Sequence, residues 1–153
     1  MRVIPNKGIL ETLACPFFMP VKRLEEDGTW FHPSRLPLKG GWDGRCCAPG
    51  HEEVSLTRED LRECNLGYAV SCLRLPRERT CDALRFSIVQ DADEKLVLCF
   101  VRELNHHPVE HGTLEYDLAT ARWKSSHGDA RLQRMAECYV ETYLERRVVA
   151  ASA

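Results

Sequence analysis

The sequence predicts an α+β domain: an antiparallel β-meander of three to four strands, packed by a C-terminal helix, follows an irregular cysteine-rich N-terminal lobe. Three observations predict it. Apolar and polar residues alternate after residue 82, apolar residues recur at helical spacing near the C-terminus, and prolines, glycines and cysteines crowd the earlier part. A chain of 153 residues fits one domain, which we divide into a loop-rich lobe, residues 1–81, and a sheet with its helix, residues 82–153.

The strands of the meander are predicted from the alternation that begins after Asp82. The alternating apolar positions are Leu84, Phe86 and Ile88 in the first strand and Leu114, Tyr116 and Leu118 in the third. Between them, Leu96–Leu104 is apolar on both faces as far as Val101, as in a central strand. A fourth short strand is expected around Trp123, and the polar links are short enough for antiparallel neighbours.

The C-terminal helix is predicted to begin after Asp129, which follows Gly128 and is suited to cap the first turn. Its apolar stripe consists of Leu132, Met135, Ala136, Tyr139, Val140, Tyr143 and Leu144. We expect this stripe to cover one face of the sheet. Cys138 falls away from the centre of the stripe and is predicted to be peripheral, whereas Cys99 in the central strand is predicted to belong to the core.

The N-terminal lobe lacks the sustained period of a helix or a strand. Six of the eight prolines and six of the nine glycines lie in the first fifty residues, together with aromatic residues such as Phe17, Trp30 and Trp42. Such a segment is too apolar for a disordered tail, yet ordering it costs about 1–2 kcal/mol per residue. A multidentate metal centre would offset that cost, because structural metal sites contribute on the order of 10 kcal/mol.

One short helix is expected inside the lobe. Thr57 and Asp60 resemble a capping box, with Asp in place of the usual Glu, and Leu61 supplies an inward residue. Asn65 and Gly67 are good helix terminators, so Cys64 is predicted to lie in the last turn.

The candidate metal centre consists of four of the eight cysteines, separated by 30, 17 and 7 residues: Cys15, Cys46, Cys64 and Cys72. In a reducing compartment, several cysteines in irregular backbone indicate metal or redox chemistry rather than disulfides. Cys47 is the alternative to Cys46, because consecutive side chains tend to diverge and only one of the pair is expected to bind. Cys81 is the alternative to Cys72.

The spacing favours an iron–sulfur cluster of the [4Fe-4S] type over zinc. Structural zinc sites present paired ligands about two to four residues apart, and none of these gaps fits. A cubane is wider than a single ion, and its four thiolates can come from separate loops. Cys15-Pro16 also resembles, in this dipeptide alone, the Cys-Pro ending of the ligand run in bacterial ferredoxins. Zinc, or no metal at all, remains the alternative.

The neighbours of these cysteines suit a partly buried anionic centre. Four thiolates around a doubly positive cubane leave a charge of about −2, which nearby arginines would partly neutralise. Those arginines are Arg45, Arg62 and Arg74. The aromatic residues expected to exclude solvent are Phe17, Phe18, Trp42 and Tyr68.

A second constellation, HHPVEHG, places His106, His107, Glu110 and His111 in a predicted loop between strands. Imidazoles and carboxylates in one loop can bind a metal or transfer protons. No recognised ligand spacing is present, so a solvated turn is the simpler interpretation.

Composition excludes or leaves unsupported several classes of function. The formal net charge of −2 and the lack of a basic run give no footprint for nucleic acid, and no apolar stretch reaches the roughly 18–20 residues that span a bilayer. The N-terminal residues lack the unbroken apolar core of a signal peptide, which predicts a cytoplasmic protein. No phosphate-binding glycine loop, G-x-S-x-G elbow or H-E-x-x-H helix is present.

We therefore predict an iron–sulfur protein that acts in electron transfer, cluster carriage or redox sensing with a protein partner, without nucleic acid or membrane. The leading alternative is a zinc-stabilised module that binds another protein. The third is a thiol-dependent enzyme that uses a cysteine and a histidine, although the sequence does not locate such a pair.

Overall fold

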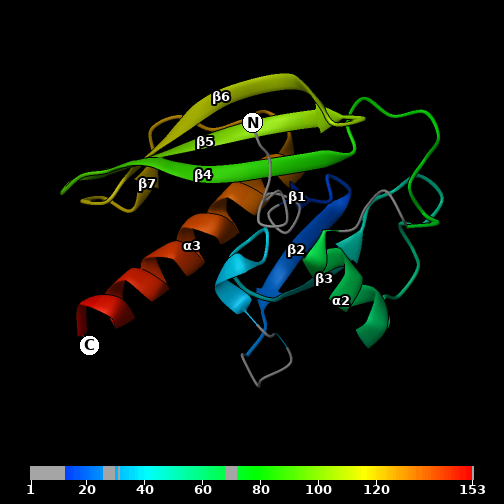
Figure 1. Ribbon diagram of the computed structural model, residues 1–153, viewed down its shortest axis with the longest axis horizontal. Helices are drawn as coiled ribbons and strands as arrows, with labels where there is room; N and C mark the ends of the chain where they lie inside the picture. The colour runs from blue at the N-terminus through cyan, green and yellow to red at the C-terminus, as the bar shows by residue number, and fades with distance from the viewer. Residues whose placement is uncertain (1–12, 26–29, 31, 68–71, 153) are drawn as a thin grey trace, which may run out of the picture.

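The computed structural model of the protein describes residues 13–25, 30, 32–67 and 72–152. A curled antiparallel sheet of five strands, in the order β1-β4-β5-β6-β7, lies across one long helix, α3 (Ala130–Ser152) (Figure 1). The strands are β1 (Leu13–Ala14), β4 (Ala83–Asp91), β5 (Lys95–Leu104), β6 (His107–Asp117) and β7 (Arg122–Trp123). The mixed α+β architecture with a C-terminal helix agrees with the expectation from the sequence.

The predicted number of strands, three to four, is too low. The additional strand is β1, which comes from the N-terminal lobe and pairs with β4, placing Leu13 opposite Arg85. A strand of two residues carries no readable alternation, so the apolar pattern does not reveal it. This pairing attaches the segment just before Cys15 to the edge of the main sheet.

The N-terminal lobe contains a second sheet of two strands, which the sequence does not predict, so apart from its short helix the lobe is less irregular than expected. Strand β2 (Phe18–Arg23) pairs with β3 (Trp42–Cys46), with a bulge after Pro20. Pro20 and Gly44 hide this ribbon from pattern reading, because both residues usually interrupt a strand. Gly44 is required where it stands, since a β-carbon would lie 2.2 Å from the Met19 carbonyl oxygen. One turn of 3-10 helix, η1 (Pro33–Arg35), lies between the two strands in the chain.

The short helix of the lobe forms where the sequence predicts it. Helix α2 (Arg58–Leu66) begins with a complete capping box, in which Thr57 Oγ1 accepts the Asp60 N–H and the Asp60 carboxylate accepts the Thr57 N–H, each at 3.0 Å. The helix ends at Gly67, whose left-handed backbone has φ +79°. The prediction that Cys64 lies in the last turn is confirmed.

One hydrophobic core joins the lobe to the sheet and to α3. Apolar side chains from all three parts pack together in it, so the lobe does not fold around a separate core. Its buried members include Ala14, Phe18, Leu38 and Trp42 from the lobe, Leu84, Leu96, Leu98 and Phe100 from the sheet, and Leu132, Met135 and Ala136 from α3.

Two thiols outside the lobe lie elsewhere than predicted. Cys138, expected to be peripheral, is completely buried, because α3 packs on β2 as well as on the main sheet and so buries more than one stripe. Cys99, expected to be core, is half-buried. Buried and half-buried residues alternate along the middle of β5, and Cys99 belongs to the half-buried set.

Polar side chains of α3 hold the lobe through its backbone. They donate to carbonyl oxygens of loop and strand residues that are more than a hundred positions away in the sequence. The bonds run from Arg131 to Pro16 (2.9 Å), from Arg134 to Pro20 and Val21 (both 3.0 Å), from Thr142 to Leu38 (2.6 Å) and from Arg146 to Lys39 (2.7 Å). They fix the position of the lobe relative to the helix.

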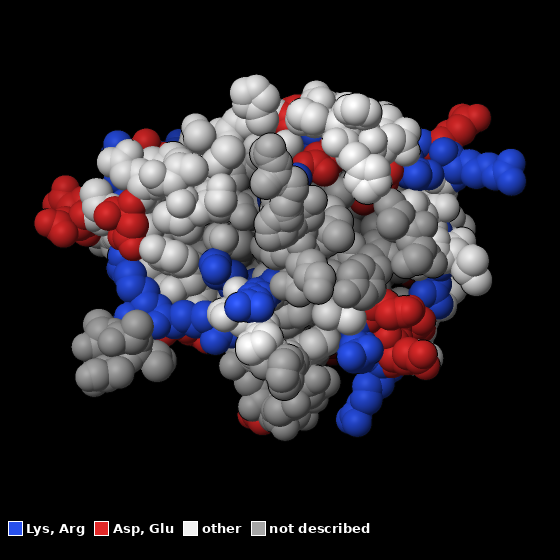
Figure 2. Space-filling view, viewed as in Figure 1, with Lys and Arg blue, Asp and Glu red and all other residues white. Residues whose placement is uncertain are grey.

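Acidic and basic side chains are interspersed on the face shown in Figure 2, as expected for a formal net charge of −2. Within the part of the chain that the structure describes, no helix combines the length and the apolar character needed to cross a membrane.

The contact between α2 and β1 predicts that Gly67→Ala destabilises the protein much more than Gly50→Ala. Both glycines have positive φ, +79° and +84°, so each alanine adds strain of about 1–2 kcal/mol. Only at position 67 does the β-carbon also collide, 1.7 Å from the Leu13 carbonyl oxygen; nothing lies within 4 Å of it at position 50. Urea unfolding measures both effects, and equal losses of unfolding free energy would contradict the contact.

Candidate metal centre

The four candidate ligands come from separate segments of the lobe. Cys15 follows β1 directly, Cys46 ends β3, Cys64 lies in the last turn of α2, and Cys72 follows further along the chain. Cys46 is buried, Cys15 and Cys64 are half-buried, and Cys72 is exposed. The set therefore extends from the interior of the protein to its surface.

The structure brings these thiols into electrostatic reach of one another. Burial is the largest of the causes that raise the pKa of Cys64 to about 12. Three neighbouring thiolates raise it as well, those of Cys15, Cys46 and Cys72. A nearby like charge disfavours the ionised form of a thiol. Residues separated by as many as 30 positions in the sequence thus share one electrostatic environment.

The backbone donates hydrogen bonds to two of the sulfur atoms. Burial raises the pKa of Cys15 to about 12, against the opposing effect of bonds from the N–H groups of Phe17 and Phe18. The Sγ of Cys46 accepts the Ala48 N–H at 3.4 Å. Hydrogen bonds to cysteine sulfur stabilise a thiolate ligand and are among the features that set the potential of iron–sulfur clusters.

Helix α2 is fixed to strand β3 by the buried side chain of Asn65. Its Oδ1 accepts the Trp42 N–H, and its Nδ2 donates to the Trp42 carbonyl, each at 2.8 Å. Nδ2 also donates to the Leu61 carbonyl within α2 at 2.7 Å. This clamp joins the two elements that carry Cys64 and Cys46. The sequence suggests only helix termination for Asn65, because a partner on a distant strand leaves no local pattern.

The end of α2 also lies directly against β1. The Gly67 backbone approaches Leu13 so closely that a β-carbon would sit 1.7 Å from the Leu13 carbonyl oxygen. Leu13 is two residues before Cys15, and Gly67 is three residues after Cys64. This contact therefore joins the segments of a second pair of thiols.

Arg74 supplies positive charge beside the thiols. Its guanidinium lowers the pKa of Cys64. The pKa of Arg74 itself is raised, first by its hydrogen bond to Asp60 and also by the thiolates of Cys72 and Cys46. The ion pair with Asp60, at 3.4 Å, ties Arg74 to the first turn of α2. The other expected cations, both exposed, are Arg45 and Arg62.

The aromatic residues expected around the centre have different positions. Phe18 and Trp42 are buried in the common core. Phe17 is half-buried, with the Arg131 guanidinium 5.6 Å from the centroid of its ring. Tyr68 lies outside the described residues.

The two alternative ligands have other surroundings. Cys47 is half-buried, and its backbone N–H binds the Phe17 carbonyl at 2.7 Å. Cys81 is buried, which raises its pKa, and its charged neighbours include Arg102 and Asp129. All eight cysteines are free thiols. Among the described residues, no three histidine, cysteine, aspartate or glutamate side chains converge closely enough to hold a single metal ion.

The HHPVEHG stretch forms a turn and the first half of a strand instead of the predicted loop. Asn105 and His106 adopt positive φ, 52° and 70°, and pairing with β5 begins at His107. Glu110 lies on this strand and meets the His127 imidazole, whose Nε2 is 2.9 Å from the carboxylate. The sequence does not indicate His127, because it follows Glu110 by 17 residues and meets it only through the tertiary fold.

Comparisons of the chain with protein-family models, with curated proteins and with solved structures find no match. The functional assignment therefore depends on the chemistry of the site.

The clamp predicts that Asn65→Ala lowers both stability and metal content. The substitution leaves the buried N–H and carbonyl of Trp42 without partners, which costs about 1–3 kcal/mol for such a group. The helix that carries Cys64 then loses its fixed position against β3, so less metal should be retained per chain. Urea unfolding and elemental analysis measure the two effects.

Gln90→Ala is the matched control, since it removes an exposed amide from β4, and it should change neither quantity. Full stability together with full metal content in Asn65→Ala would show that the clamp does not position the centre.

Proposed function

We propose that the protein carries a [4Fe-4S] cluster on Cys15, Cys46, Cys64 and Cys72, and acts in electron transfer, cluster carriage or redox sensing. The observation that supports the proposal is that the Asn65 clamp and the contact of Gly67 with Leu13 join the segments that carry Cys46, Cys64 and Cys15. After burial, the thiols of Cys15, Cys46 and Cys72 also raise the pKa of Cys64. Isolated buried cysteines pack anywhere in a core as small apolar side chains. Thiols that come from four separate segments of one lobe are the kind of ligand set that a cluster, wider than a single ion, would take.

Three features of the surroundings support a cluster. The ligand set is all cysteine, which is the ordinary ligation of a [4Fe-4S] cubane and leaves a net charge of about −2. Arg74 lies beside the thiols and offsets part of that charge. The backbone N–H groups directed at Cys15 and Cys46 stabilise thiolates. Bound iron would also offset the high pKa values of Cys15 and Cys64, because it replaces their protons.

The exposed position of Cys72 supports exchange with a protein partner. An exposed ligand brings one edge of a cluster to the surface, where an electron or a whole cluster passes to another protein. Leu73, the next residue, is fully exposed and would be covered by such a partner. The partner we propose is a protein rather than nucleic acid or membrane, and the compartment is the cytoplasm, where thiols stay reduced.

A zinc-stabilised protein-interaction module is the second candidate, because zinc also takes sets of four cysteine ligands. The thiols of the described residues would have to move closer together to hold a single ion. A tetrahedral zinc ion needs its sulfur ligands about 3.8 Å apart, closer together than a cubane does. Metal analysis separates the two. Iron with acid-labile sulfide supports the cluster, whereas zinc without sulfide supports the module.

The ligand assignment predicts the effect of single cysteine substitutions. Changing Cys15, Cys46, Cys64 or Cys72 to serine should remove most of the iron and sulfide from protein purified without oxygen, because each variant loses one of the four thiolates. Iron and sulfide determination measures the loss. Full retention of both in Cys64→Ser and Cys72→Ser would refute the assignment.

Control substitutions test whether the effect is specific. Cys99→Ser and Cys138→Ala change thiols outside the set and should keep the cluster. Cys47→Ser should also keep it, in contrast to Cys46→Ser. Equal and undiminished content in the Cys46 and Cys47 variants would mean that neither binds or that each replaces the other, and the double variant separates those outcomes.

Metal removal should loosen the lobe more than the sheet. Helix α2 has only nine residues and depends on Asn65 and on the thiol ligands, whereas β5 lies in the centre of the sheet. Hydrogen exchange with and without metal should therefore show the largest loss of protection along Arg58–Leu66 and Trp42–Cys46. The smallest loss is expected along Leu96–Val101 and Leu132–Leu144. Equal losses in both groups would contradict a local role for the metal.

A further inference from the structure

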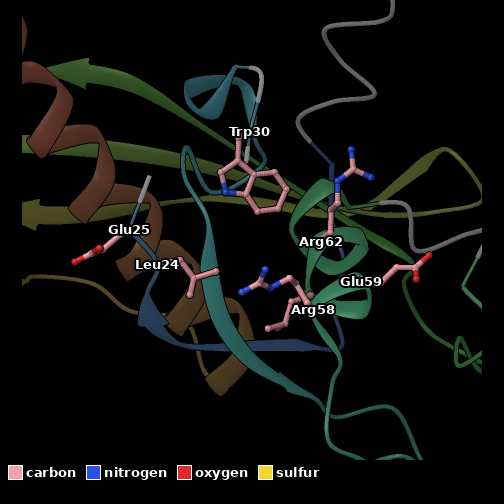
Figure 3. Close-up of a pocket in the computed structure, with 7 residues that line it drawn as sticks. Leu24, Glu25, Trp30, Arg58, Glu59 and Arg62 are labelled. Carbon is pink, nitrogen blue, oxygen red and sulfur yellow. The ribbon is translucent and has the colours of Figure 1, made fainter. Parts of the chain in front are cut away.

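A cavity with a volume of about 780 Å³ lies between the first half of α2 and the chain that follows β2 (Figure 3). Its volume is within the range of pockets that enclose small organic ligands, roughly 300–1,000 Å³. None of its lining residues is a cysteine, so the cavity holds none of the proposed cluster ligands. Its lining combines apolar, basic and acidic side chains.

The apolar walls come from three side chains. Leu61 packs against the common core, so that wall is fixed. Figure 3 shows the Trp30 indole facing Leu24 and the Arg58 side chain across the cavity. The indole lies close to Gly41, where a β-carbon would come within 2.5 Å of the indole Nε1. Glycine at position 41 therefore lets the indole approach the backbone, where a larger residue would collide with it.

Two of the lining residues are basic. Arg58 and Arg62 are separated by one turn of α2 and lie on the same side of the helix. Within the described residues, neither guanidinium has a hydrogen-bond or ion-pair partner. The two acidic lining residues, Glu25 and Glu59, extend away from the space between Trp30 and Arg58 in Figure 3. In Figure 3 the Arg58 guanidinium lies below the Trp30 indole and the Arg62 guanidinium lies beside it, so an aromatic anion on the indole would have one arginine on each of two sides.

We propose that this cavity binds a small aromatic anion, with a flat apolar body against Trp30 and a carboxylate or sulfonate on Arg58 and Arg62. Guanidinium groups bind planar carboxylates through paired hydrogen bonds, which gives arginine its preference for such ligands. An indole offers a large and rigid surface for an aromatic ring. The site goes beyond the proposed cluster function and does not depend on which metal the thiols hold.

Calorimetric titration of the full chain with 2-naphthoate and its neutral counterpart 2-naphthamide tests the proposal. The two probes share a ring system and differ in charge. We expect saturable binding of 2-naphthoate at least tenfold tighter than that of 2-naphthamide, and weaker in high salt because exposed charges are screened. Equal affinities for the two probes, or no saturable binding of 2-naphthoate, would overturn the proposal.

Two double variants locate the site. Arg58→Gln/Arg62→Gln should weaken 2-naphthoate binding at least tenfold and leave 2-naphthamide binding unchanged. Arg77→Gln/Arg122→Gln removes the same charge from exposed positions outside the cavity and should bind as the unmodified chain does. If both double variants lost the same affinity for 2-naphthoate, the net charge of the protein would explain the effect, and the proposal would be overturned.

A measurement on the unmodified chain guards against misfolded variants. The indole N–H resonance of Trp30, identified by its disappearance in Trp30→Phe, should shift when 2-naphthoate is added. The resonances of Trp42 and Trp123, which lie outside the cavity, should shift much less. An unchanged Trp30 resonance at saturating probe would place any binding elsewhere and overturn the proposal.

Discussion

Asn65 binds both backbone groups of Trp42 and the carbonyl of Leu61, and these three hydrogen bonds give a helix of nine residues a fixed place in the protein. A helix of this length is marginal by itself in water, so its presence depends on such tertiary contacts. Both candidate sites depend on it in turn. The last turn of α2 carries the proposed ligand Cys64, and its first half supplies Arg58 and Arg62 to the cavity beside Trp30. A shift of α2 would therefore disturb both sites at once.

The lobe that carries the thiols is held from the other side by α3. Helix α3 contributes apolar side chains to the common core. The position of the lobe on the helix is fixed by arginine and threonine side chains of α3, which donate hydrogen bonds to carbonyl groups of the lobe. Buried carbonyl groups in loops need partners, and long side chains from a rigid helix provide them without a regular sheet. The lobe is thus ordered in large part by the protein itself. A bound cluster would add to this order around the thiols, where β1, β3 and α2 meet, rather than create the fold.

The sequence predicts the helices and strands that are stabilised by residues close to one another in the chain. Helix α2 is readable because Thr57, Asp60 and Gly67 act within a few residues of one another, and α3 because Asp129 accepts the N–H groups of its first turn at 2.9 and 3.3 Å. The ribbon of β2 and β3 is not readable, because its proline and glycine are tolerated only at a bulge and at a close approach of two strands. The burial of Cys138 and the contact of His127 with Glu110 depend on elements that are distant in the sequence. The spacing of residues along the chain therefore does not predict them. The four candidate ligands are predicted from their residue type and from the irregular sequence around them. The contacts that hold their segments together involve Asn65 and Gly67, whose tertiary roles the sequence does not show.

The clamp at Trp42 has a further consequence for how copies of the chain behave in concentrated solution. A ribbon of two strands has two open edges, and unpaired N–H and carbonyl groups along them are templates for intermolecular pairing. On β3, the Asn65 amide occupies both backbone groups of Trp42. On β2, Arg134 occupies the carbonyls of Pro20 and Val21, and the proline has no N–H to offer. These contacts cover part of both edges, so fewer backbone groups of the ribbon can pair with strands from other molecules while α2 and α3 remain docked against it.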